Sequence, residues 1–157
     1  MNLRSTIKFF GTLTFVMILL SCGGSIESQK RDELISSFKD NFGFEPPNSV
    51  KEIKLKNWGL RDASTHWMAF TYDSNVLSKI IVHDQPLRIA SSNSNEFSKI
   101  IKEIQKSAHN PDWFELPGIE TEKIYYKKDF LNHTFSQYYL WTNKRSGMTF
   151  LYVDYFD

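Results

Sequence analysis

Apolar side chains recur every three or four residues in three stretches of the chain, the spacing that places them on one face of an α-helix. The third stretch is the most clearly divided, since Phe97 and Ile100 share one face and lysines occupy the other. Gly43 is expected to end the first helix, and Asn93 and Glu96 have the spacing of a capping box at the start of the third. The expected helices run from Ser28 to Phe42, from Asp73 to Ile81 and from Asn93 to Lys106.

Other stretches alternate apolar and polar side chains, which is typical of a β-strand with one buried face. Strands are expected over residues 50–58, 66–72, 122–127, 135–142 and 148–155, with a short extended piece at 87–90. The loops between the last three strands are too short for parallel crossovers, and Asn143 to Gly147 has the composition of a hairpin loop. The pattern therefore predicts an α+β domain, in which two to three helices pack on one face of an antiparallel sheet of about five strands.

The first 21 residues have the organisation of a signal peptide. Arg4 and Lys8 form a basic start, and an apolar run from Phe9 to Leu20 follows them. As a helix this run would extend about 18 Å, which is short of a hydrocarbon core of about 30 Å. We therefore expect an export signal rather than a permanent membrane span.

The export signal ends in Leu19-Leu20-Ser21-Cys22, which resembles the lipobox of bacterial lipoproteins. Cys22 is the single cysteine of the chain and stands where the lipobox requires one. The resemblance implies cleavage before Cys22, a diacylglycerol on its thiol, and a lipid anchor in a bacterial cell membrane. Gly23 is not the aspartate of an inner-membrane retention signal, which indicates the outer membrane in a double-membraned bacterium.

The expected organisation is a signal peptide at 1–21, a lipidated cysteine with a polar tether at 22–29, and a single α+β domain at 30–157. The stretch from Gly43 onward is also similar to small uncharacterised bacterial lipoproteins. The similarity lies in Phe44-Glu45-Pro46-Pro47 before the first strand and in a closing hairpin rich in tyrosine. It implies the fold and carries no motif of known chemistry.

Charge and cysteine content narrow the classes of function. Residues 1–21 hold two basic residues and no acid, so the remaining chain has 17 basic and 18 acidic residues and a net charge of −1. A nearly neutral domain has no electrostatic reason to bind nucleic acid. With Cys22 acylated, the folded domain has no cysteine for a disulfide, a thiolate metal site or a thiol nucleophile.

Residue types that support catalysis are present but form no recognisable motif. No two histidines have helical metal-ligand spacing, and the neighbours His83 and Asp84 would point to opposite faces of a strand. The chain has no serine on a glycine-flanked elbow and no glycine-rich phosphate loop. We therefore expect a non-enzymatic protein without a metal or cofactor. The four histidines are His66, His83, His109 and His133.

Aromatic residues make up 15% of the chain and crowd its C-terminal half. Alternation places Tyr139 and Trp141 on one face of their strand, and Phe150 and Tyr152 on one face of the next. If helices cover only one face of the sheet, these four rings form an exposed candidate binding patch on the other. If long loops or another helix cover that face, the rings belong to the core.

Three functions remain open from the residues alone. The first is a lipid-anchored, non-enzymatic module that binds another envelope protein, one version being an immunity-type protein that neutralises an incoming toxin. The second is a lipoprotein that binds a glycan or small ligand, which requires an aromatic platform ringed by polar side chains in a concave surface. The third is a hydrolase with dispersed residues, which requires a polar pocket with a perturbed pKa.

Overall fold

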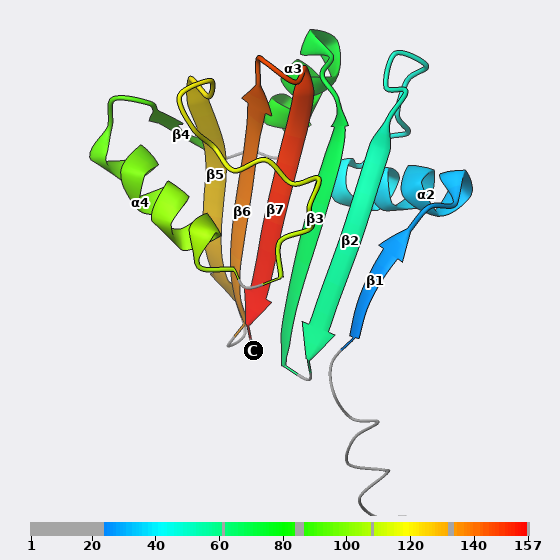
Figure 1. Ribbon diagram of the computed structural model, residues 1–157, viewed down its shortest axis with the longest axis horizontal. Coiled ribbons are helices and arrows are strands. Elements are labelled where there is room, and N and C mark those ends of the chain that lie inside the picture. The colour runs from blue at the N-terminus through cyan, green and yellow to red at the C-terminus, as the bar shows by residue number, and fades with distance from the viewer. Residues whose placement is uncertain (1–23, 61, 84–86, 108, 132–133, 157) are drawn as a thin grey trace, which may run out of the picture.

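The computed structural model describes residues 24–60, 62–83, 87–107, 109–131 and 134–156. In these residues a single antiparallel sheet has seven strands in the order β1-β2-β3-β7-β6-β5-β4 (Figure 1). The strands are β1 (Gly24–Ser28), β2 (Ile53–Leu60), β3 (Ala63–Thr71), β4 (Arg88–Ser91), β5 (Lys123–Leu131), β6 (Thr134–Asn143) and β7 (Met148–Phe156). The helices of the same residues are α2 (Arg31–Phe42), α3 (Ser74–His83) and α4 (Asn95–Gln105).

The α+β class is confirmed, but the expected five strands are too few because the sheet has seven. The two additional strands, β1 and β4, are its edges. Residues 24–28 were expected to be tether, yet they pair with β2 from Gly24 opposite Gly59 to Ser28 opposite Leu55. Main-chain pairing at an edge needs no apolar side chains, so a polar stretch gives no alternation by which to recognise such a strand.

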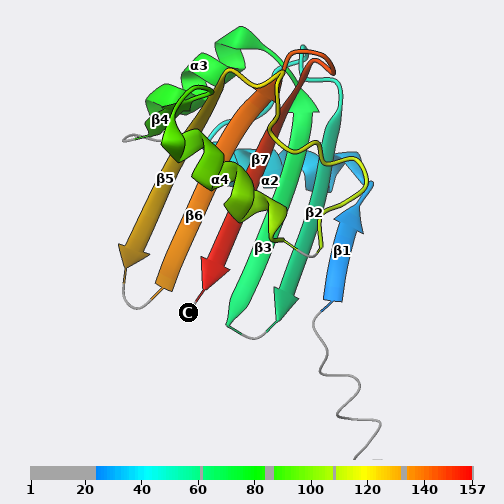
Figure 2. The ribbon, with the colours of Figure 1, turned by 60° about the vertical axis from the view of Figure 1, so that its left-hand side comes forward.

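The helices lie on both faces of the sheet, which corrects the prediction that they share one. Helices α2 and α3 cover one face (Figures 1 and 2). Helix α4 and the segment between α4 and β5, called the connector here and described at residues 106–107 and 109–122, cover the other. The reason lies in the central strands, since β7 is buried at every position from Thr149 to Val153. A strand with apolar side chains on both faces requires cover on both.

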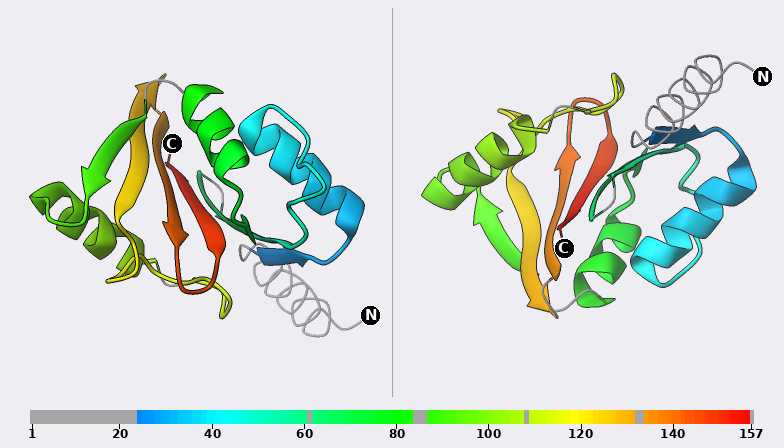
Figure 3. Two further views of the ribbon diagram at one scale, coloured as in Figure 1. Left: turned by 90° about the horizontal axis from the view of Figure 1, so that it is seen from above. Right: turned by 90° about the horizontal axis from the view of Figure 1, so that it is seen from below.

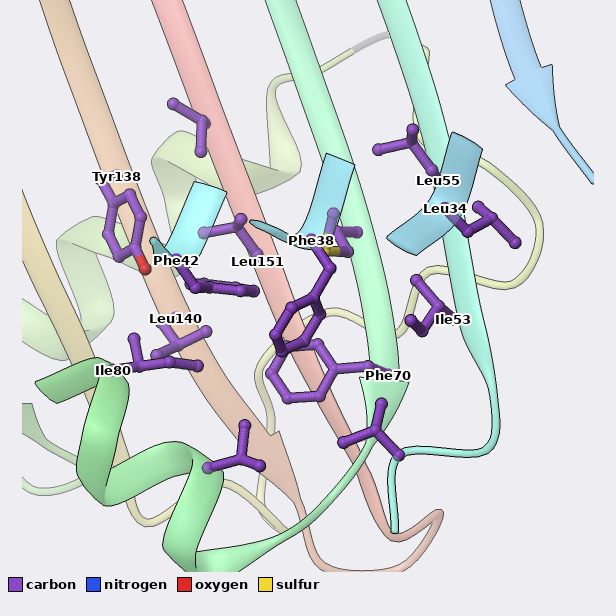
Figure 4. Packing of buried hydrophobic residues seen from close by; sticks show 14 residues of the cluster. Leu34, Phe38, Phe42, Ile53, Leu55, Phe70, Ile80, Tyr138, Leu140 and Leu151 are labelled. Carbon is purple, nitrogen blue, oxygen red and sulfur yellow. The ribbon is translucent and has the colours of Figure 1, made fainter. Parts of the chain in front are cut away.

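The first core lies between the sheet and helices α2 and α3. Phe38 and Phe42 of α2 meet Phe70 of β3 edge to face, with ring centroids 5.2 Å and 5.5 Å apart. Figure 4 shows these rings against the aliphatic side chains of the sheet and of α3. Those aliphatic neighbours include Ile53, Leu55, Ile80, Leu140 and Leu151, and Leu34 of α2 joins the same core.

Local capping agrees with the sequence at two helix ends and differs at a third. Gly43 ends α2 with φ 74°, and its N–H donates to the Lys39 carbonyl at 2.7 Å. Asp73 caps α3 by accepting from the N–H groups of residues 75 and 76. Helix α4 is capped by Ser94 rather than Asn93, because the Ser94 hydroxyl accepts from the Phe97 N–H at 3.2 Å.

The second core lies under α4 and contains all four residues of the candidate binding patch. Tyr139, Trp141, Phe150 and Tyr152 are buried, so the prediction of an exposed patch is wrong. Their shared face was predicted correctly, but α4 and the connector cover it. Phe114 of the connector packs edge to face on Trp141 and Phe150, with ring centroids 5.3 Å and 5.7 Å apart. The view along the strands in Figure 3 shows α4 and the helix pair on opposite sides of the sheet.

Replacing Trp141 by Ala is therefore expected to destabilise the fold rather than to remove a binding surface. Trp141 is 0% exposed, and truncation of a buried tryptophan costs about 3–5 kcal/mol through lost contacts and the cavity that remains. Urea unfolding followed by circular dichroism measures this change. The control is Phe130→Ala, which truncates an aromatic side chain that is 72% exposed and is expected to change the free energy of unfolding by about 0.5 kcal/mol or less. Equal losses in both variants would contradict the assignment of Trp141 to the core.

Candidate functional site

Side chains on the α4 side of the sheet fall into rows that cross the strands. Trp58 of β2 lies opposite Thr65 of β3, which lies opposite Asp154 of β7. The row continues through Gln137 of β6 to Lys128 of β5. The next row toward the middle of the strands is aromatic and consists of Trp67, Tyr152, Tyr139 and Tyr126. The buried face thus changes from aromatic to polar within two residues along each strand.

A cleft of ≈ 400 Å³ lies over this polar row. The sheet forms its floor, and the end of α4 with the start of the connector forms one wall. From the sheet the lining residues are Trp58, Thr65, Gln137, Tyr152, Asp154 and Phe156. From the wall they are Glu103, Lys106, Ser107 and His109. Of the four residues that sequence alone proposed for binding, Tyr152 is the one that lines this cleft.

Asp154 is held in the floor by two hydroxyl groups. The Thr65 hydroxyl donates to Asp154 Oδ1 at 2.8 Å, and the Tyr152 hydroxyl donates to Oδ2 at 3.1 Å. Burial raises the pKa of Asp154 above its ordinary value of 3.8, and these two hydrogen bonds offset only part of that rise. Asp154 is therefore a carboxyl group of fixed orientation whose charged form is disfavoured.

Glu103 reaches the cleft from α4 and is ionised more easily than an ordinary glutamate. Burial raises its pKa, but hydrogen bonds from Tyr139 and Lys128, together with the positive charges of Lys128 and Lys106, outweigh burial, so the pKa is lowered overall. The Lys128 ammonium lies 3.0 Å and 2.9 Å from the two carboxylate oxygens. The Tyr139 hydroxyl also contacts Gln137 Oε1 at 2.8 Å, and burial with its bond to Glu103 raises the pKa of Tyr139.

An aromatic pair borders the cleft on the β2 side. The His109 ring stacks on the Trp58 indole, with centroids 4.7 Å apart and planes inclined by 19°. Trp58 is half-buried against the second core, and His109 is exposed. Packing beneath Trp58 fixes the orientation of the pair, which presents flat ring surface beside the polar floor.

The other two histidines of the described residues, His66 and His83, do not line the cleft. His66 lies on the opposite face of the sheet, where its Nδ1 is 2.8 Å from Asn57 Oδ1 and where burial lowers its pKa. His83 lies at the end of α3, close to Gly43. His133 and Cys22 fall outside the described residues. Within the described ranges, no group of three or more His, Cys, Asp or Glu side chains is placed to hold a metal ion.

A second cavity, of ≈ 320 Å³, lies at the other end of the strands. It is lined in part by Tyr72, Leu77 and Tyr125. Three charged residues, Glu122, Lys123 and Lys144, line it, and the carboxylate of Glu122 pairs with the ammonium of Lys144 at 2.6 Å. The cleft over Asp154 combines a stacked aromatic pair with polar side chains from β3, β6, β7 and α4, so it is the stronger candidate site.

Comparison with protein-family models, curated proteins and solved structures yields no match to this chain. The helices of the described residues include none that is long and apolar enough to cross a membrane. The case for a function therefore depends on the chain's own residues and their arrangement.

Sequence reasoning missed the cleft, although one signal for it was present. Gln137 has the same parity as Tyr139 and Trp141, and Asp154 has the same parity as Phe150 and Tyr152. Alternation therefore puts a polar side chain at the end of a buried face on two adjacent strands. The contribution of Glu103 had no comparable signal, because it depends on how α4 crosses the sheet.

Asp154→Asn is expected to reveal the raised pKa of the carboxyl through the pH dependence of stability. Between 3.8 and the higher folded-state pKa the native protein binds more protons than the unfolded chain, so its free energy of unfolding falls as pH rises. The free energy of unfolding of the unmodified protein minus that of Asp154→Asn should therefore decrease from below pH 3.8 toward neutral pH. Urea unfolding of both proteins across this range measures the difference, and a constant or rising difference would refute the assignment.

Proposed function

We propose that this chain is a lipid-anchored, non-enzymatic envelope protein that binds a saccharide or a similar polyhydroxylated small molecule in the cleft over Asp154. One observation carries the proposal: the stacked Trp58 and His109 rings border a floor made by Thr65, Asp154 and Gln137. Flat ring surface beside convergent polar groups is the combination that recognises a molecule with apolar C–H faces and hydroxyl edges.

The charges around the cleft favour a neutral ligand. Asp154 and Glu103 are acidic, whereas Lys106 and Lys128 are basic, and Glu103 and Lys128 already pair at 2.9 Å. Gln137 adds an amide that can both donate and accept. A balanced set of donors and acceptors suits hydroxyl groups better than a phosphate or an ammonium group, each of which needs an excess of opposite charge.

The same hydrogen bonds support binding over catalysis. Both oxygens of Asp154 accept from neighbouring hydroxyls, and Glu103 accepts from Lys128 and Tyr139. Each carboxyl oxygen can accept two hydrogen bonds, so both oxygens of Asp154 keep one position for a hydroxyl of the ligand. Held in this way, the two carboxyl groups are suited to fixed recognition, and we infer no reaction at this site.

The lipid anchor is supported by the sequence around Cys22 and by an export signal before it. Acylation of this thiol would place the domain on a bacterial cell membrane, and Gly23 favours the outer membrane where a bacterium has two. A protein partner, the other function considered, would have to use a different surface from Tyr139, Trp141, Phe150 and Tyr152, because these residues are buried.

Cys22→Ala is expected to abolish lipid attachment. The full chain and the variant would be expressed in a bacterial host supplied with a labelled fatty acid, and labelled protein would be detected after electrophoresis. We expect label on the unmodified chain, no label on Cys22→Ala, and a shift of the variant from the membrane to the soluble fraction. An unlabelled unmodified chain would refute the anchor without bearing on the cleft.

Trp58→Ala is expected to weaken ligand binding by about tenfold, which corresponds to about 1.4 kcal/mol. Saccharides from bacterial envelopes would be screened on an array with the full chain, and the best binder would then be titrated by calorimetry. Removing the indole takes away the ring surface that supports His109.

Trp113→Ala is the matched control, because this half-buried tryptophan packs on the same core but does not line the cleft. Thermal unfolding of both variants would separate lost affinity from lost structure. Equal weakening by the two substitutions, or no saccharide bound by the unmodified protein, would contradict the proposed ligand class.

A further inference from the structure

A row of apolar side chains forms the end of the sheet beyond the cleft. Leu60 of β2 lies opposite Ala63 of β3, which lies opposite Phe156 of β7. The row continues through Phe135 of β6 to Phe130 of β5. These five residues, called the rim here, stand on the same face as the polar row and two residues further along each strand.

Several apolar side chains of the rim are exposed to water, which is unfavourable for apolar surface. Leu60 and Phe156 are each 43% exposed, and Phe130 is 72% exposed. Phe135 and Ala63 are half-buried. Adjacent exposed apolar side chains on several strands form a continuous surface rather than scattered single residues, and such surfaces mark contacts with proteins or membranes.

The chain enters the sheet at this same end. Gly24, the first residue of β1, lies opposite Gly59, the residue before Leu60. Figures 1 and 2 show β1 starting where β7 ends and where β2 turns into β3. Cys22 precedes Gly24 by two residues, which span about 7 Å at most. A lipid on Cys22 therefore lies close to the rim.

We infer that the rim rests in the boundary between headgroups and acyl chains of the bilayer that holds the lipid on Cys22. This inference depends on the proposed lipid anchor and adds to it a fixed orientation. The anchor lets the domain approach the bilayer only from the end at which β1 begins, and the rim is the apolar surface at that end.

The side chains of the rim itself indicate how it would contact a lipid bilayer. The five residues of the row are uncharged. Among the described residues next to them in sequence, Asp62 and Asp129 are exposed acids, and Lys128 in the adjacent row is an exposed base. Arg61, which follows Leu60 in sequence, lies outside the described residues. Anionic lipids attract basic residues, which the row does not contain. The rim itself therefore contacts the bilayer through apolar area.

Depth-dependent fluorescence quenching tests this contact. The full lipidated chain carrying Phe130→Cys would be labelled with a small fluorophore at that thiol, because acylation blocks Cys22. It would be reconstituted into phosphatidylcholine vesicles containing lipids with a nitroxide near the headgroup. The control is Ile119→Cys, a fully exposed position that precedes β5 at its other end. We expect several-fold stronger quenching at position 130 than at position 119.

Mass spectrometry of the N-terminal peptide from the same samples reports the lipid on Cys22 separately. Lipid present with equal quenching at both positions would overturn the rim contact and leave the anchor standing. Lipid absent would overturn both. Fluorophore self-quenching at position 130 that disappears when the protein is diluted in the bilayer would assign the rim to a second copy of the chain, and would also overturn the inference.

Discussion

The burial of both faces of β6 and β7 is the constraint on which the rest of this structure depends. Leu140 and Leu151 point to one side and Trp141 and Phe150 to the other, and all four are buried. Neither face can be left to water, because large rings and branched aliphatic chains together account for most of the free energy that stabilises the fold. Helices α2 and α3 cover the face that carries Leu140 and Leu151. Helix α4 and the connector bearing Phe114 cover the face that carries Trp141 and Phe150.

The site follows from where that cover ends. Helix α4 and the connector span the aromatic row, and the sheet extends beyond them toward the polar row. At this boundary the tyrosine hydroxyls of the second core need partners, and Asp154 and Glu103 supply them. Polar groups buried without partners are costly, so the edge of an aromatic core is a natural place for a hydrogen-bonded cleft.

Local physics predicted much of this fold from the sequence. Gly43 marked a helix end because glycine readily adopts the left-handed conformation that ends a helix. Asp73 marked a helix start because its side chain can accept from the free N–H groups of the first turn. Parity placed Tyr139 with Trp141 correctly, because side chains alternate on any strand. Whether that shared face was covered could not be read, since the cover includes Phe114, which lies in an irregular stretch. The cleft could not be predicted either, because Glu103 and Tyr139 meet only through the packing of α4 on the sheet.

The pairing of Gly24–Ser28 with β2 affects how an anchored form of this protein could leave its membrane. Many exported domains are connected to their anchors by flexible linkers. Proteases cut such linkers readily, because an exposed segment without main-chain pairing can bind in a protease active site. Here a backbone anchored at Cys22 would become part of the sheet within two residues. A protease would have to peel β1 from the sheet edge before cutting within it. A domain held in this way through the proposed lipid on Cys22 would stay close to the bilayer surface.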